Sequence, residues 1–199
     1  MRHALAPLLA LAAATSAALF VSPDPASARD PDHAHKAAYF EDLPLIGGSG
    51  GHSYTLMCPS GQVLTGVRYR VGALVDGLGI KCSKVKADGS LGPSTDVGSM
   101  VGGNGGTAGS ATCQTSGEVI AAQQGASAGV GIGGLHFLCF TWYGHNYGGT
   151  SNDIINVIGF LPAFIAQQCR DGNEPAIGIY GRHGSLVDAV GLKCGYVNH

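Results

Sequence analysis

The sequence predicts an all-β protein built from three internal repeats, and three observations support this prediction. From Leu43 onward, short apolar runs are separated by glycine-rich breaks, without the sustained 3.6-residue period of a helix. Residues 181–194 nearly repeat residues 69–82, with eight identities in fourteen positions. Six cysteines recur at regular intervals through the same part of the chain. Self-similarity of this kind is typical of an architecture assembled from equivalent units.

Length and composition limit the classes of protein that the chain can belong to. With 199 residues the chain is the size of one domain that can bury a substantial core. It contains 33 glycines without a collagen period, which predicts many tight turns. Only 12% of the residues are charged and the net charge is −2, so no basic surface for a polyanion is expected. We therefore expect no nucleic-acid partner.

The N-terminus has the features of an export signal. Arg2 and His3 precede an apolar run from Ala4 to Val21, and Ala26-Ser27-Ala28 matches the small-residue pattern of a cleavage site. We expect residues 1–28 to be a signal peptide cleaved after Ala28, with an uncleaved anchor as the alternative. Cleavage predicts a secreted, extracellular or periplasmic protein that is not inserted in a membrane. The even number of cysteines fits an oxidising compartment.

Residues 29–42 are polar and are expected to be a flexible mature N-terminus. They include His33 and His35, which supply too few ligands for a closed metal site, so we expect no metal and no cofactor. Residues 43–199 are expected to form a single domain. Its strand candidates are 54–57, 63–71, 74–85, 119–120, 132–143, 154–165, 177–180 and 186–197. The run 154–165 could instead contain a helical turn, and Pro162 favours an edge strand or a bulge there.

The cysteine spacing divides the domain into three repeats, at about residues 43–85, 100–142 and 147–197. Six cysteines allow 15 pairings. The first cysteine of each pair recurs after 55 and then 56 residues, and the gaps within the pairs are 24, 26 and 25 residues. This periodicity favours the pairs Cys58–Cys82, Cys113–Cys139 and Cys169–Cys194. Each disulfide is expected to close the open end of a hairpin.

Two further elements recur in the repeats. Glycine-rich loops at 47–51 and 102–106 precede two of the units, and Gly148-Gly149 precedes the third at a longer distance. Hairpin turns with the pattern Gly-x-x-x-Asp occur at 72–76 and 184–188. This combination resembles the jacalin-related lectins, especially their mannose-binding branch. The resemblance implies a β-prism of three four-stranded antiparallel sheets with pseudo-threefold repeats, in which sugar lies between the glycine loop and the Gly-x-x-x-Asp turn.

Carried over to this chain, the resemblance implies two carbohydrate sites. The residues of the first are Gly47, Gly48, Gly184, Ser185, Leu186, Val187 and Asp188. Those of the second are Gly72, Ala73, Leu74, Val75, Asp76, Gly102 and Gly103. A carboxylate can accept charge-assisted hydrogen bonds from two neighbouring sugar hydroxyls, and a glycine loop lets backbone donors approach closely. The middle unit carries Gly133 where the aspartate should be, so we expect no third site.

Several alternatives remain open at this stage. Gly-x-x-x-Asp also occurs at 92–96 and 149–153, and aspartate at a hairpin turn often satisfies loop N–H groups. Trp142, Tyr143 and Tyr147 could stack on a sugar, although packing is the favoured interpretation.

We predict metal-independent recognition of mannose- or glucose-type glycans. The resemblance implies that the galactose branch uses a newly cut glycine amino terminus in its site. Cleavage after Ala28 would leave the new amino terminus of this chain far from Gly47, so the mannose branch is the better match. The alternative is an extracellular structural module with the same fold, similar to vitelline-membrane outer-layer proteins. Ser49 and Ser127 match Gly-x-Ser-x-Gly but lack the helix that a nucleophile elbow needs, so no enzyme is expected. A homo-oligomer is left open.

Overall fold

The structure is a computed structural model that describes residues 41–115, 117–158, 165–170, 172 and 174–197. The expected signal peptide, the residues up to 40 and the pair His33 and His35 lie outside the described residues. The strands are β1 (Glu41–Asp42), β2 (Ile46–Gly47), β3 (His52–Met57), β4 (Gln62–Val71), β5 (Val75–Lys84), β6 (Thr95–Gly102), β7 (Thr107–Thr112), β8 (Glu118–Ser127), β9 (Ile132–Trp142), β10 (Tyr147–Ile158), β11 (Ile165–Gln168), β12 (Ala176–His183) and β13 (Val187–Cys194).

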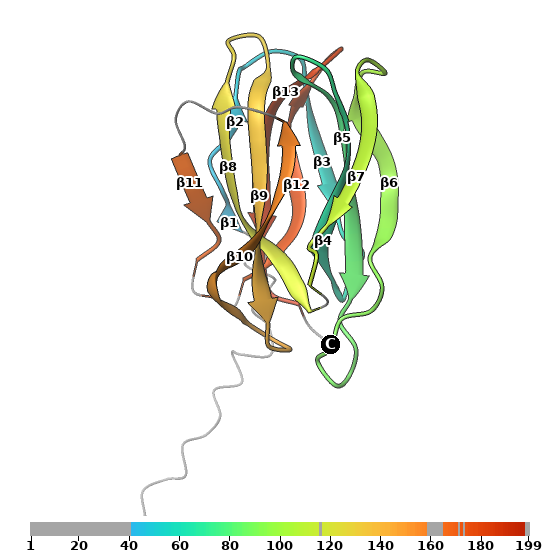
Figure 1. Cartoon of the computed structure of the whole chain (residues 1–199), viewed down its shortest axis with the longest axis vertical. Helices are drawn as coiled ribbons and strands as arrows, with labels where there is room; N and C mark the ends of the chain where they lie inside the picture. Colours follow the sequence, from blue (N-terminus) through green and yellow to red (C-terminus); the bar gives the residue numbers. More distant parts are fainter. Residues whose placement is uncertain (1–40, 116, 159–164, 171, 173, 198–199) are drawn as a thin grey trace, which may run out of the picture. The chain divides into compact units, whose positions relative to one another are not determined.

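The strands form three antiparallel sheets, each built around a central hairpin (Figure 1). The first sheet has the order β6-β5-β4-β7 and the second the order β10-β9-β8-β11. In the third sheet β12 and β13 form the hairpin, β3 flanks β12, and the short strands β1 and β2 both pair with β13. The first and last described strands therefore lie in the same sheet, and the all-β fold with three antiparallel sheets is as predicted. No helix that could span a membrane occurs in the described part of the chain.

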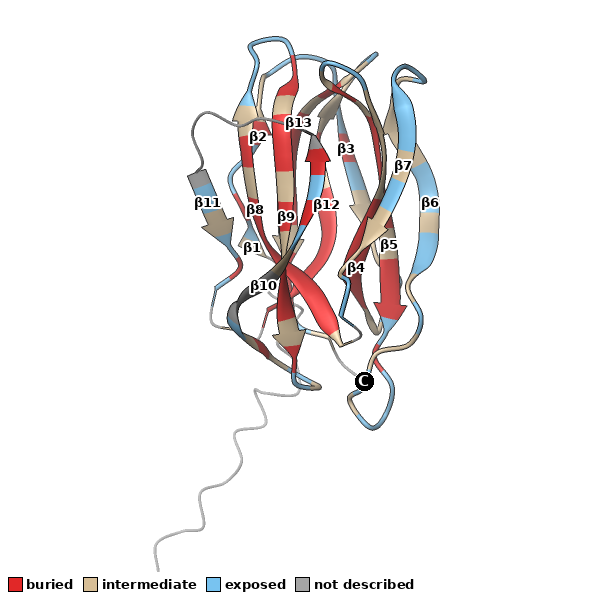
Figure 2. Cartoon of the chain, viewed as in Figure 1, coloured by how far each residue is buried: buried red, intermediate tan, exposed pale blue. Residues whose placement is uncertain are grey.

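The central hairpins supply the core between the sheets. Val67 of β4, Ile80 of β5, Phe137 of β9 and Ile179 of β12 are all fully buried. Figure 2 shows the same contrast along the ribbon, with buried central strands and largely exposed outer strands β6 and β7. Burial of apolar side chains from all three hairpins in one cluster explains why the repeats fold together, because no single sheet can cover its own apolar face.

A β-bulge at the same place in each hairpin positions the disulfides. The extra residues are Thr65, Ala121 and Ile177. Their carbonyl oxygens accept hydrogen bonds from the backbone N–H groups of Cys113, Cys169 and Cys58, respectively, at 2.8–3.0 Å. Bulges disrupt the regular ladder and free a carbonyl for such a partner.

The disulfides are Cys58–Cys82, Cys113–Cys139 and Cys169–Cys194, as expected. The first cysteine of each pair follows an outer strand of one sheet, and the second lies in the central hairpin of the next sheet. Each disulfide therefore closes a hairpin and also joins two neighbouring sheets. We call this end of the sheets the cystine end, and the opposite end, with the hairpin turns, the turn end.

The outer strands β6 and β7, all of β11 except Ile165, and the short strands β1 and β2 were not among the sequence candidates. The segments of β6 and β7 are rich in glycine, serine and threonine and carry no clear alternation of polar and apolar residues. They lie at sheet edges with much of their surface exposed, so packing does not impose an apolar pattern on them.

The glycine element expected at Gly148-Gly149 is also placed differently. Gly148 pairs with Thr141 inside the sheet and does not form a third glycine loop. The connection between β10 and β11, residues 159–164, lies outside the described residues, together with Pro162.

The packing interpretation of two aromatic residues is confirmed. Trp142 and Tyr147 are buried, whereas Tyr143 is exposed. The Trp142 indole Nε1–H donates a hydrogen bond of 2.9 Å to the carbonyl oxygen of Gly89, which attaches the 86–90 turn of the first sheet to β9.

We expect Trp142→Phe to lower the free energy of unfolding by about 1–3 kcal/mol, because the Gly89 carbonyl loses its donor and the smaller ring leaves a gap. Urea unfolding measures this change. The exposed Tyr143→Phe is the matched control and is expected to change stability by less than about 0.5 kcal/mol. Equal effects of the two substitutions would contradict the assigned contact.

Candidate functional site

The turn between β12 and β13 directs the Asp188 side chain away from the core. The Gly184 N–H donates to the Leu186 carbonyl at 2.9 Å, which closes the turn. Successive residues of a strand face opposite sides. Val187 therefore points inward and is fully buried, and the next residue, Asp188, points outward and is only half-buried. The turn thus places one carboxylate beside the turn end of the third sheet.

The glycine loop between β2 and β3 lies directly against this carboxylate. Gly48 N–H donates to the Asp188 carbonyl oxygen at 2.8 Å. A Cβ atom on Gly50 would lie 2.7 Å from Asp188 Oδ1, and one on Gly51 would lie 2.5 Å from Oδ2. Gly51 also has a φ of +63°, which favours glycine. A side chain at Gly50 would displace the carboxylate, and one at Gly51 would also meet the His183 backbone carbonyl.

Arg182 holds the loop in place. Its Nε donates to the Gly50 carbonyl at 2.7 Å and its Nη2 to the Gly51 carbonyl at 2.6 Å. The guanidinium thus binds the two residues that contact the carboxylate. Sequence reasoning gave Arg182 no role, although its identity with Arg70 in the repeat was a usable signal.

The first sheet contains a second site with the same geometry. Asp76 follows the turn between β4 and β5, and the Gly103 N–H donates to its carbonyl oxygen at 2.7 Å. Gly105 and Gly106 pack against its carboxylate, and Gly106 has a φ of +60°. Arg70 donates to the carbonyl oxygens of Gly105 and Gly106 at 2.7 and 3.0 Å. The two predicted pairs of loop and turn are therefore brought together by the fold.

The corresponding turn of the second sheet has no carboxylate. Ala128 N–H donates to the Gly131 carbonyl at 2.9 Å, and Gly133 follows the first residue of β9 just as Asp76 follows Val75. This position of Gly133 agrees with the sequence alignment of the repeats. The described residues thus contain two carboxylate-bearing turns of this type.

Some of the expected site residues are placed differently. Val75 and Val187 have no exposed surface, so they belong to the core and cannot touch a ligand. The loop glycines nearest the carboxylates are Gly50, Gly51, Gly105 and Gly106. Gly47, Gly48 and Gly102 instead pack against the backbone of the aspartates, as does Gly103 through its N–H.

At the tips of the turns, Ser185 and Ala73 are exposed and Leu186 and Leu74 are half-buried. Both leucines approach the third turn, since a Cβ on Gly131 would lie 3.7 Å from the Cδ1 atom of each. The leucines of the two sites thus both lie beside the turn of the second sheet.

The two sites also touch each other. His183 Nδ1 accepts a hydrogen bond of 3.3 Å from the Gly102 N–H, and Gly103 packs against the Ser185 carbonyl. Behind them, the Tyr54 ring lies edge-on to the His183 ring at 5.7 Å between centroids. The Tyr54 hydroxyl donates to the Ala189 carbonyl at 3.2 Å, and burial raises the pKa of Tyr54, so this hydroxyl keeps its proton. The turn of one site is thus braced on the loop of the other.

Hydrogen bonding distinguishes Asp76 and Asp188 from the aspartates of the other two Gly-x-x-x-Asp sequences. Asp96 accepts from Lys81 Nζ at 2.6 Å, which is the main cause of its lowered pKa, and also pairs with Arg68. Asp153 accepts from the Gln114 N–H at 2.6 Å and from Gln114 Nε2 at 3.1 Å.

By contrast, no donor within the described part of the chain binds the Asp76 or Asp188 carboxylate. Within this part of the chain, neither carboxylate serves the structural role of satisfying loop N–H groups. Both retain acceptor capacity, and at Asp188 the Oδ2 atom is itself buried against the glycine loop.

We expect Arg182→Ala to weaken the expected binding of mannose at the Asp188 turn about three- to tenfold. The glycine loop loses the two hydrogen bonds that fix its distance from Asp188. Titration of the isolated first site, in an Asp76→Asn background, measures this change. Arg170→Ala removes a highly exposed arginine paired with Glu41 at the cystine end and is the matched control. Equal binding by the two variants would contradict the role of Arg182.

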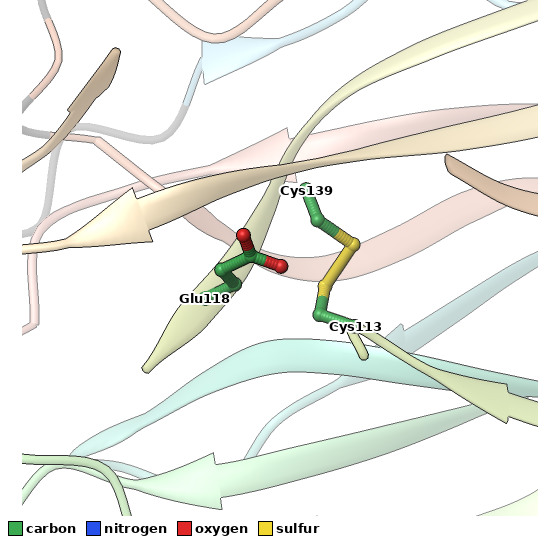
Figure 3. A group of neighbouring side chains, drawn as sticks. All are labelled: Cys113, Glu118 and Cys139. Atoms are coloured by element: carbon green, nitrogen blue, oxygen red, sulfur yellow. A yellow bond between two sulfur atoms is a disulfide. The ribbon is translucent and has the colours of Figure 1, made fainter. Parts of the chain in front are cut away.

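One group of possible metal ligands occurs in the described residues, and it lies away from both sites. Figure 3 shows the Glu118 carboxylate turned toward the sulfur atoms of Cys113 and Cys139, and the candidate ligand atoms all lie within 4.8 Å of one another. Both sulfurs are joined in a disulfide, so neither is a thiolate that could bind a metal. This cluster is therefore the Cys113–Cys139 disulfide, which links two sheets, with the Glu118 carboxylate beside it.

Comparisons with known proteins give the fold a family context. The chain matches no protein-family model and no curated protein sequence. Among solved structures, wild-type Malaysian banana lectin is similar with a TM-score of 0.53 and 20% identity, covering 79% of this chain and 97% of that one. A mannose-binding jacalin-related lectin from Ananas comosus has a TM-score of 0.55 and 23% identity, covering 78% and 96%.

Artocarpin, a lectin with mannose specificity, has a TM-score of 0.57 and 11% identity, covering 79% of this chain and 99% of its own. The likeness thus spans nearly the whole length of each lectin and most of this chain. At these identities it shows the fold alone, which is the β-prism of jacalin-related lectins.

Proposed function

We propose that the protein binds carbohydrate at the two sites of the turn end, which we call the Asp188 site and the Asp76 site. The observation that carries the proposal is the pair of equivalent aspartates with unused acceptor capacity, each set against a glycine loop held by an arginine. A pyranose offers neighbouring hydroxyls that donate to a carboxylate, and loop N–H groups supply donors without loss of side-chain entropy.

Mannose- and glucose-type glycans are the proposed ligands, and binding needs no metal. Two of the structurally similar lectins bind or are specific for mannose according to their descriptions. The sites offer a carboxylate, backbone groups and the aliphatic side chains Leu74 and Leu186, a combination suited to hydrogen bonding of hydroxyls with apolar contact to ring carbons. In this proposal the protein binds its ligand without catalysing a reaction.

An exported location is part of the same proposal. Three disulfides link the sheets, and disulfides persist in oxidising compartments such as the extracellular space or the periplasm. The signal peptide expected at residues 1–28 would direct the chain there.

Retention on immobilised mannose tests the proposal. We expect the protein to be retained in the presence of EDTA and to be released by free methyl α-mannoside. A galactose column is the control and is expected to retain the protein less. Passage through the mannose column, together with an empty result on a broad glycan array, would overturn the proposal and favour a structural module with the same fold.

A further inference from the structure

A polar cavity lies at the cystine end, away from both turn-end sites. Its volume is about 280 Å³, and it opens between the connection from β5 to β6 and the connection from β7 to β8. Thr65 and Ser83 line it near the start of β4 and the end of β5, whereas the Asp76 turn follows the far end of β4. The six residue steps from Thr65 to Val71 span about 20 Å, so the cavity and the turn-end sites cannot share one small ligand.

A row of three hydroxyl groups lies along the cavity wall. Thr65 Oγ1 is 2.8 Å from Ser83 Oγ and 2.9 Å from Ser94 Oγ. Thr65 and Ser83 are only 4% and 2% exposed, and Ser94 is half-buried at the edge of the cavity. Three hydroxyls carry three protons, and the two hydrogen bonds between them use two. One proton and several lone pairs therefore remain for a ligand.

The pseudo-threefold arrangement shows that the fold itself does not need these hydroxyls. The bulge residue is Thr65 in the first sheet, but Ala121 and Ile177 in the other two. The partner strand carries Ser83 in the first sheet and Phe140 at the equivalent place in the second. Burial of hydroxyls is less favourable than burial of apolar groups unless they find partners. The polar row is therefore a specialised feature of one repeat.

The charge of the cavity limits the ligand class. Glu118 reaches the cavity from β8 and is 4% exposed, and no lysine, arginine or histidine of the described residues lines the cavity. The lining therefore offers no countercharge for an anionic ligand. Leu91 and Pro93 add an apolar surface that suits the C–H face of a small ring.

The walls are fixed by contacts with the second sheet. Gln114 is bound through its N–H and its side-chain amide to Asp153 of β10. The turn that precedes Leu91 is held by the hydrogen bond from Trp142 to Gly89. Fixed walls reduce the entropy lost when a ligand binds, so the cavity is suited to bind a small molecule.

We infer that this cavity is a separate binding site for a small neutral polyol, of the size of a monosaccharide or a cyclitol. The Thr65, Ser83 and Ser94 hydroxyls and the Glu118 carboxylate would bind the ligand hydroxyls, and Leu91 and Pro93 would cover its carbon skeleton. The site does not depend on carbohydrate binding at the turn end.

The test uses the full chain with Asp76→Asn and Asp188→Asn, so that the turn-end sites do not contribute. Ligand-detected NMR titration with myo-inositol and with methyl α-mannoside measures binding. We expect saturable binding of at least one probe with a Kd on the order of millimolar. Added Thr65→Ala is expected to weaken it about tenfold, because the central hydroxyl of the row is lost.

Thr65→Ala reproduces the alanine that the second sheet carries at its bulge, so the fold is expected to tolerate it. Ser99→Ala removes an exposed hydroxyl from β6 of the same sheet and is expected to leave binding unchanged. The absence of saturable binding of either probe to the double variant would overturn the inference. Equal binding with and without the Thr65 hydroxyl would also overturn it. If the turn-end sites bind no sugar, both measurements still test the cavity, because the double variant already lacks the two aspartates of those sites.

Discussion

Replacement of both Asp76 and Asp188 by asparagine is expected to abolish retention on mannose. Each carboxylate has acceptor capacity that the described part of the chain does not use, and each would accept charge-assisted hydrogen bonds from sugar hydroxyls. Hydrogen bonds to charged groups contribute about 1.5–3 kcal/mol each, so loss of one such bond at a site lowers its affinity roughly 10- to 100-fold. Affinity chromatography and calorimetric titration measure the loss.

Stability separates this functional role from a structural one. An aspartate that satisfies loop N–H groups would destabilise the protein when replaced, whereas Asp188 Oδ2 is buried without a hydrogen-bond partner in the described residues. We therefore expect the double variant to keep the free energy of unfolding of the wild type within about 1 kcal/mol. Asp96→Asn is the matched control, because this Gly-x-x-x-Asp aspartate is paired with Lys81. Equal mannose affinity of the Asp96 variant and the double variant would contradict the assignment of the sites.

Removal of a disulfide is the second change with a large expected effect. Each disulfide closes a loop of 24–26 residues and joins two sheets. In the chain-entropy model, closure of such a loop stabilises the folded state by roughly 3 kcal/mol. We expect Cys113→Ala with Cys139→Ala to lower the free energy of unfolding by about this amount, as measured by urea unfolding.

The pseudo-threefold arrangement supplies the comparison for this experiment. The three pairs have Cα–Cα distances of 5.7–5.8 Å and occupy equivalent positions, so the three double variants are expected to lose similar stability. Losses below about 1 kcal/mol in all three variants would show that the disulfides do not hold the sheets together.

The features that the sequence predicts are those that the repeats encode by residue identity. The turns at Asp76 and Asp188, the three cysteine pairs and the missing aspartate at Gly133 are all visible as matches or mismatches between repeats. Outer strands β6 and β7 escaped prediction because exposed edge strands need no apolar alternation.

Details that depend on distance also escaped prediction. Glycines at 50, 51, 105 and 106 contact the carboxylates, whereas the site residues expected from the sequence were the earlier glycines of each loop, at 47, 48, 102 and 103. The inward direction of Val75 and Val187 follows from strand alternation and could have been predicted from the neighbouring aspartates. The hydroxyl row of the cavity could not, because its residues come from three separate segments of the chain.

The number of sugar molecules bound per chain tests the central claim most directly, namely that two equivalent sites share one design. Native mass spectrometry with a mannose oligosaccharide, in a concentration range well below that at which the cavity fills, is the measurement. We predict two ligands per wild-type chain, one in Asp76→Asn, one in Asp188→Asn and none in the double variant. A single ligand per wild-type chain that neither single substitution removes, or two ligands in the double variant, would contradict the account.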